Sequence, residues 1–207
     1  MHYVETERDR DAEDLAAVSA VLRGEAGAFR LLIDKYGGMV LRLSRNFLGS
    51  GEDAEDASQE IFLRAFRSLR TFRIERRFLP WLCGIAMNHL RTRYRREKRF
   101  KEKADRAKAE PVDGNVLEDP VILAERADAR RAVREAVSGL PANLREAVLL
   151  YYFEGLGVQE IAEALGIGTE NVKSRLFRAR GKLRSMLERR ATGEEAKRYT
   201  VGSAEHV

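Results

Sequence analysis

Cysteine and histidine are scarce in this 207-residue chain, and each shortage excludes a kind of site. Cys83 is the only cysteine, which excludes an internal disulfide and a cysteine-rich zinc site and suits a reducing cytosol. Its plain interpretation is a small buried apolar group, because a redox sensor needs an exposed, electropositive thiol. The three histidines form no metal-ligand pair, and the sequence has no phosphate-binding glycine loop or nucleophile motif. We therefore expect no metal site, no cofactor and no catalytic residue, which leaves an enzyme as the least supported class.

Long apolar runs are also missing from the sequence. No stretch approaches the roughly 20 apolar residues that cross a bilayer, and the acidic N-terminus lacks the order of a secretion signal. We expect no membrane insertion and a cytoplasmic protein. Charge is abundant instead, at 34% of residues with a net charge of +5. The bases gather in two blocks, residues 91–103 and 173–190, which a polyanion would bind.

The periodic signal throughout the chain is helical. With four prolines and no strand-length alternation of β-branched residues, we predict an all-α fold of two small helical domains. Residues 99–120 are highly charged, carry few large apolar groups and predict a flexible linker between the two domains. The predicted order is a flexible N-terminal extension at 1–13, a first domain at 14–98, the linker at 99–120, a second domain at 121–190 and a flexible tail at 191–207.

A helix-turn-helix at residues 158–176 is the sharpest local pattern. Ala162 is small where two helices must cross closely, Gly166 stands at the turn, and Val172 faces back onto the first helix. An arginine-rich helix alone would indicate only a solvated face, but next to this turn it favours entry into a DNA major groove. The candidate contacts, near the start of the second helix, are Glu170, Asn171, Lys173, Ser174, Arg175 and Arg178.

The upstream basic block begins on a helix that also carries Trp81 and Asn88. Basic side chains can follow a phosphate backbone, and aromatic side chains interleaved with them can stack on unpaired nucleotide bases. The plainer interpretation keeps Trp81 in the core and makes the basic run a solvated helix end. On the residues alone the plainer interpretation is favoured for Trp81.

The acidic stretch at residues 53–60 allows three interpretations. It can be a metal or acid–base cluster, a helix start favoured by the helix dipole, or a protein-docking face. We favour a helix start combined with a docking face. The helix that follows is expected to bury Ile61, Phe62, Ala65, Phe66 and Leu69, which recur at the spacing of one face.

Three motifs, at residues 53–69, 78–88 and 140–187, occur in the order found in one family. Together they resemble bacterial RNA polymerase sigma factors of the sigma-70 family, and specifically group IV, the extracytoplasmic-function (ECF) group. Members of that group contain only the second and fourth conserved sigma regions, joined by a variable linker. The resemblance implies a non-enzymatic transcription initiation factor whose partners are core RNA polymerase, promoter DNA and an anti-sigma factor.

The resemblance also assigns residues to these partners. It implies polymerase docking through Asp53, Asp56, Gln59 and Glu60. It implies that the loop at 72–78 captures a flipped base of the −10 element, and that the helix after it holds the adjacent DNA. The residues so assigned are Phe72, Arg73, Arg77, Phe78, Trp81, Asn88, Arg91 and Arg95. The helix-turn-helix would read the −35 element as duplex, and the alternative is a stand-alone helix-turn-helix regulator.

Overall fold

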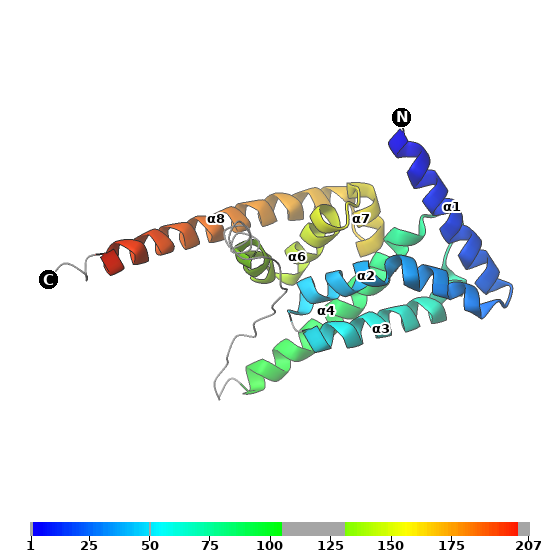
Figure 1. Cartoon of the computed structure of the whole chain (residues 1–207), viewed down its shortest axis with the longest axis horizontal. Coiled ribbons are helices and arrows are strands. Elements are labelled where there is room, and N and C mark those ends of the chain that lie inside the picture. The colour runs from blue at the N-terminus through cyan, green and yellow to red at the C-terminus, as the bar shows by residue number, and fades with distance from the viewer. Residues whose placement is uncertain (1, 50, 105–130, 203–207) are drawn as a thin grey trace.

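Two groups of helices make up the chain in the computed structural model, which describes residues 2–49, 51–104 and 131–202 (Figure 1). The first group contains α1 (His2–Leu22), η1 (Ala26–Ala28), α2 (Phe29–Leu48), α3 (Gly51–Ser68), η2 (Leu69–Thr71) and α4 (Phe78–Ala104). The second contains the helical residues 131–138, then α6 (Ala142–Val148), the π-helical segment η3 (Leu149–Phe153), α7 (Val158–Leu165) and α8 (Thr169–Gly202). The all-α prediction is confirmed, with no strand in the described ranges. None of the described helices is long and apolar enough to cross a membrane.

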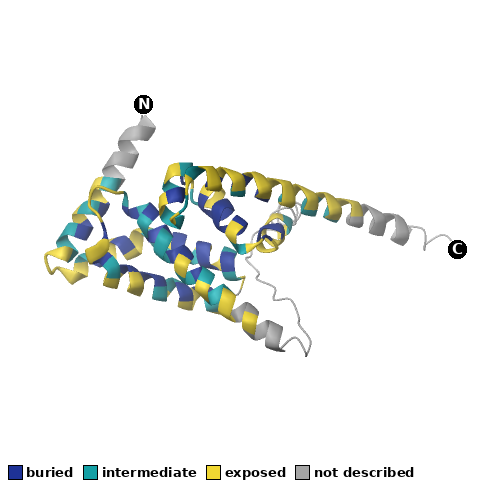
Figure 2. Ribbon diagram, turned by 180° about the vertical axis from the view of Figure 1, so that it is seen from behind, coloured by how far each residue is buried: buried dark blue, intermediate teal, exposed yellow. Residues whose placement is uncertain are grey.

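The core of the first group lies where α2, α3 and α4 meet, and Figure 2 shows the buried residues gathered there. Alanines at 54, 57 and 65 are fully buried on α3, and their small side chains let α2 approach closely. The predicted α3 face is confirmed except for Phe66, which is 41% exposed. The Phe66 ring lies at the core's edge and packs edge-to-face on Phe29, with 5.1 Å between ring centroids.

The helix-turn-helix of the second group is formed by α7 and α8. α7 ends at Gly166, whose φ of +65° is the left-handed conformation that the sequence predicts for this turn. At the other end of α7 the Gly157 N–H donates to Glu160 Oε2 at 2.8 Å, which caps the helix. Val172 is fully buried, so the start of α8 faces back onto α7 as expected.

Three helices extend further than the sequence predicts. α1 begins at His2, inside the predicted flexible extension, and α8 continues to Gly202, through most of the predicted tail. α4 runs to Ala104, so residues 99–104 of the predicted linker are helical, while residues 105–130 lie outside the described ones. Alanine, glutamate, lysine and arginine are frequent in these extensions, and such residues favour a helix without burying an apolar face.

A buried arginine joins the two groups. Arg145, on α6, is 3% exposed, and its Nη1 donates to the carbonyl oxygen of Phe47 at 2.6 Å. Phe47 lies in the last turn of α2, where carbonyl groups have no partner within the helix and a positive charge is favourable. The guanidinium also lies over the rings of Tyr94 and Phe47, 4.9 and 5.3 Å from their centroids.

Close backbone packing holds α4 against α7. A Cβ atom added at Gly84 would lie 2.8 Å from the carbonyl oxygen of Ala164, so only glycine fits at this position. A Cβ atom added at Gly37, in the interior of α2, would lie in open space. The two helical glycines therefore differ in packing while sharing a conformation that alanine can adopt.

Gly84→Ala and Gly37→Ala are expected to change stability in opposite directions. Alanine at Gly37 should raise the free energy of unfolding by roughly 0.5–1 kcal/mol, because it restricts the unfolded chain. Alanine at Gly84 should lower it by about 1–3 kcal/mol, because α4 and α7 must separate to admit the methyl group. Urea unfolding followed by circular dichroism measures both, and a stabilised Gly84→Ala would contradict the close packing.

Glu154, at the end of η3, places a carboxyl group in the junction between the two groups. Its Oε1 is buried without a hydrogen-bond partner among the described residues. Burial raises the pKa of Glu154 to about 6, although Arg42 of α2 acts to lower it. A raised carboxyl pKa favours folding when the group is protonated, so this contribution is lost as the pH rises through about 6.

Glu154→Gln should therefore stabilise the protein in a pH-dependent way. The difference in melting temperature between variant and wild type should be near zero below pH 4.5 and grow until the pH passes about 6. Glu188→Gln is the matched control, because Glu188 is exposed and pairs within α8 with Arg184. Differential scanning calorimetry from pH 4 to 8 measures both, and a pH-independent effect of Glu154→Gln would refute the assigned pKa.

Candidate nucleic-acid interface

An aromatic cluster supports the loop between η2 and α4. Phe72, Phe78 and Trp81 pack on one another with ring centroids 5.3–5.8 Å apart, and Tyr36 of α2 lies 5.7 Å from Phe78. The Tyr36 hydroxyl donates to Asp14, a buried carboxylate on α1. Phe72 and Phe78 are buried, so here they form the floor of the loop and do not present a ring face to a base. Large apolar rings in so small a domain are needed for its core.

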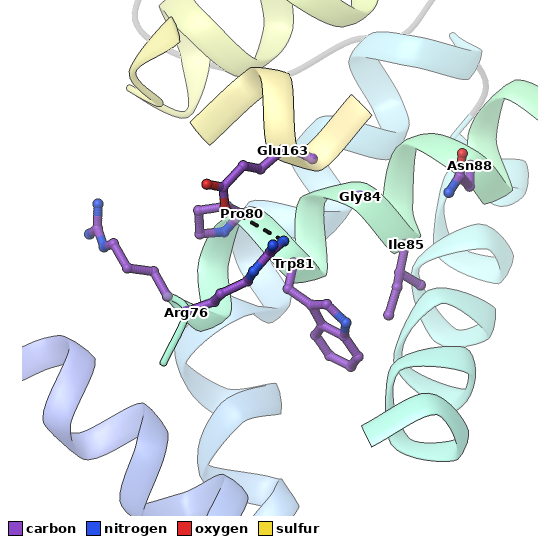
Figure 3. Close-up of a pocket in the computed structure, with 9 residues that line it drawn as sticks. Arg76, Pro80, Trp81, Gly84, Ile85, Asn88 and Glu163 are labelled. Atoms are coloured by element: carbon purple, nitrogen blue, oxygen red, sulfur yellow. Dashed lines mark ion pairs between the residues drawn. The ribbon is translucent and has the colours of Figure 1, made fainter. Parts of the chain in front are cut away.

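A hollow lies beside this loop, between α4 and α7 (Figure 3). Trp81 and Asn88, two of the predicted −10 residues, line it from α4, with Gly84 and Ile85 between them. Trp81 is only half-buried, so it contributes both to the core and to this surface. Arg76, Pro80, Gly84 and Ile85 were not predicted, although a spacing of three and four residues from Trp81 and Asn88 would have found the last two.

Acidic side chains of α1 and α7 pair with the arginines at the end of the loop. Arg77, at the end of the loop, donates from Nε to Asp11 of α1 at 2.8 Å and pairs with Glu160 of α7. Burial acts to lower the pKa of Arg77, but Glu160 and Asp11 outweigh it and raise the pKa. Arg76 pairs with Glu163 at 3.9 Å, as the dashed line in Figure 3 marks. Arg73 is exposed on the loop.

A second hollow brings predicted −10 and −35 residues together. Arg91 and Arg95 of α4 line it with Arg175 of α8, around the carboxylate of Glu146 on α6. Arg91 donates two hydrogen bonds to Glu146, from Nε to Oε1 at 2.6 Å and from Nη2 to Oε2 at 2.7 Å. Arg175 Nη1 lies 3.6 Å from Oε2 of the same carboxylate. Sequence reasoning did not find Glu146, which lies 55 residues from Arg91.

The outer face of α8 remains exposed. Glu170, Asn171, Lys173, Ser174 and Arg178 are all exposed there. Their contacts are local: Lys173 pairs with Glu170 at 2.7 Å, and Arg178 Nε donates to the Ser174 carbonyl oxygen at 3.3 Å. Phe177 is 73% exposed on the same helix and was not predicted; its place outside the buried stripe of Val172, Leu176 and Ala179 was the available signal.

The acidic start of α3 faces partly toward α4. Asp53 pairs with Arg93, and Asp56 lies 3.8 Å from the same guanidinium. Gln59 is exposed, and Glu60 pairs with Arg64 one turn further along α3 at 3.0 Å. Among the described side chains, no group of three or more acidic, histidine or cysteine residues is arranged to hold a metal ion. Cys83 is fully buried, and burial raises the pKa of its thiol.

Comparison with known proteins identifies both groups of helices. The family model for sigma-70 region 2 matches residues 32–100, and that for sigma-70 region 4 matches residues 130–183. The RNA polymerase sigma-H factor of Pseudomonas aeruginosa is 35% identical over 174 residues, which cover 81% of this chain and 90% of that protein. The ECF RNA polymerase sigma factor SigW of Bacillus subtilis is 32% identical over 82% of this chain and 94% of that protein.

A solved structure extends the likeness to three dimensions. CnrH, in complex with the cytosolic domain of CnrY, is 26% identical and superposes with a TM-score of 0.64 over 85% of this chain and 97% of that one. The region 2 and region 4 models thus match in that order along the chain. The matches to the two relatives above 30% identity cover 90% and 94% of those proteins. The chain belongs to the sigma-70 family of RNA polymerase sigma factors, in its extracytoplasmic-function group, and is a non-enzymatic transcription initiation factor.

Proposed function

We propose that this sigma factor binds core RNA polymerase and reads promoter DNA with two separate basic surfaces, one on each domain. The observation that carries this proposal is the exposed basic face of α8 in the region 4-like domain, together with the basic α4 of the region 2-like domain. We propose residues 14–98 as the first domain, 99–120 as the linker and 121–190 as the second domain. Binding to polymerase and chromosomal DNA would place the protein in the bacterial cytoplasm.

The start of α8 is the proposed reader of the −35 duplex. A helix that enters the major groove contacts bases through its first residues and phosphates through later ones. Glu170, Asn171, Lys173 and Ser174 are therefore proposed to meet base edges, with Arg178 on a phosphate. Arg175 is proposed to join them when it is released from Glu146.

The loop before α4 and the exposed side of α4 are the proposed −10 surface. Trp81 and Asn88 line one hollow together with Arg77. Arg91 and Arg95 line the second hollow, further along α4, and Arg73 is exposed on the loop. An unpaired base stacks well on an aromatic ring, and arginines hold the adjacent phosphates. Because Phe72 and Phe78 are buried under the loop, we propose that they shape it and do not themselves stack on DNA.

The exposed side of α3 is the proposed docking surface for core RNA polymerase. Asp53, Asp56, Gln59 and Glu60 supply polar groups, and Leu63 and Phe66 are unusually exposed for large apolar residues on the same helix. A mixed surface of this kind is typical of protein interfaces. An anti-sigma factor is proposed as a further partner, supported by the complex of the similar CnrH with the cytosolic domain of CnrY.

A stand-alone regulator is the less favoured alternative. In such a regulator the first domain would serve as a sensor or dimerisation domain. Residues 32–100 instead match sigma-70 region 2, and the similar proteins are named RNA polymerase sigma factors. In vitro transcription separates the two functions. Core bacterial RNA polymerase and fragmented genomic DNA from the source organism, with this protein added, should give new transcript starts that share two upstream motifs at promoter spacing. Duplex binding without new starts would favour the regulator.

Arg178→Ala should weaken promoter binding by the holoenzyme on a promoter found in that way. Loss of one phosphate contact should reduce the slope of log affinity against log salt by about 1. Arg30→Ala is the control, since Arg30 is also exposed, makes a local contact with Asp34 one turn further along α2, and lies outside both basic blocks. Filter binding across a salt series measures both slopes. Equal slopes for the two variants would remove Arg178 from the DNA contacts.

A further inference from the structure

The acidic side chains of the second domain meet the arginines of the first. Glu146 binds Arg91, Glu160 binds Arg77, and Glu163 lies near Arg76. These arginines lie on the loop and on the side of α4 that carry the proposed −10 surface. The second domain therefore covers part of that surface with carboxylates, the groups that most closely resemble DNA phosphates in their hydrogen bonding to arginine.

Glu146 is the centre of this contact. It is 1% exposed, and each of its oxygens accepts a hydrogen bond from Arg91, at 2.6 and 2.7 Å. Arg175 approaches the same carboxylate from α8 at 3.6 Å. The Glu146 carboxylate thus pairs at the same time with Arg91, a proposed −10 residue, and with Arg175, a proposed −35 residue. A carboxylate buried this deeply is stable only while such partners remain.

The packing around these pairs makes the closed arrangement specific. The Gly84 backbone fits directly against the Ala164 carbonyl group, and Arg145 reaches across to the end of α2. The contact therefore combines backbone complementarity with several oriented hydrogen bonds. A loose attraction between a basic and an acidic surface would not require a glycine at this crossing.

We propose that the region 4-like domain is an intramolecular competitor of DNA, and that Glu146 holds the free sigma factor closed by occupying Arg91 and Arg175. The inference rests on the proposed DNA-binding role of those two arginines. DNA binding then requires the domains to separate, and the apparent affinity for DNA is the intrinsic affinity reduced by the fraction of open molecules. Any partner that favours the open arrangement increases DNA binding by the same relation.

Glu146→Gln tests the closure in the full-length protein. Glutamine keeps the shape of the side chain but cannot form the charged, two-bond contact with Arg91. Small-angle X-ray scattering should give a larger radius of gyration for the variant than for wild type. Fluorescence anisotropy with a short labelled duplex of arbitrary sequence should give about tenfold tighter binding, because more molecules are open.

Glu188→Gln is the matched control for the change of charge. It removes one negative charge from the same domain, but Glu188 pairs with Arg184 within α8, away from the contact between the domains. Its radius of gyration should equal that of wild type, and its DNA affinity should rise much less than that of Glu146→Gln. Equal radii and equal affinities for the two variants would overturn the proposal. A larger radius without tighter DNA binding would overturn the competition with DNA.

A second variant covers the case in which Glu146→Gln fails to fold, as judged by circular dichroism. The double substitution Glu160→Gln and Glu163→Gln removes the two acidic partners on α7, and glutamine at 160 can still accept the Gly157 N–H. It should also enlarge the molecule and strengthen DNA binding, and failure on both counts overturns the proposal. Failure of the proposed function is distinguishable, because absence of promoter-specific transcription would leave the change in radius in place.

Discussion

The buried carboxylate of Glu146 is the electrostatic centre of the contact between the two domains, since it pairs with an arginine from each. Removing one partner from a buried ion pair costs about 3–5 kcal/mol, because the remaining charge is left without compensation in a poorly solvated site. Arg91 and Arg175 are still partly exposed, at 27% and 15% of their side-chain surface, so water reduces that figure here. Such a pair adds less to overall stability than to the choice of one arrangement over others.

This constraint links the structure of the free protein to its activity. A guanidinium group that binds a carboxylate with two parallel hydrogen bonds can bind a phosphate in the same way. The arginines that hold the domains together are therefore suited to hold DNA when the domains separate. The aromatic cluster under the loop lies within the first domain and supports its surface in both states, whereas the crossing of Gly84 with α7 exists only while the domains are packed together.

Features that depend on local sequence were predictable. The positive φ at Gly166 follows from the turn between two helices, and most of the buried face of α3 follows from apolar spacing. The helical extensions were missed because polar residues with high helix propensity also occur in flexible segments. Phe72 and Phe78 show the limit for single residues, since an aromatic ring near a loop suits both a core and a base-stacking surface.

Contacts between residues far apart in sequence were not predictable. Nothing near Arg91 in the sequence indicates Glu146, and nothing near Arg145 indicates that it reaches the carbonyl group of Phe47, 98 residues away. The candidate DNA-binding residues were therefore found one domain at a time. Their mutual proximity, and the acidic groups that separate them, appear only when the two domains are packed together.

The most direct test of this account is the distance between the two domains, measured in the free protein and in the promoter complex. Gly27 and Gly181 are exposed, have open space for a side chain and lie on different domains, so cysteines at these positions can carry a fluorophore pair. Single-molecule energy transfer should show a short distance in the free protein. It should show a longer one with core RNA polymerase and promoter DNA. The same distance in both states would contradict the account, because the arginines cannot bind Glu146 and DNA together.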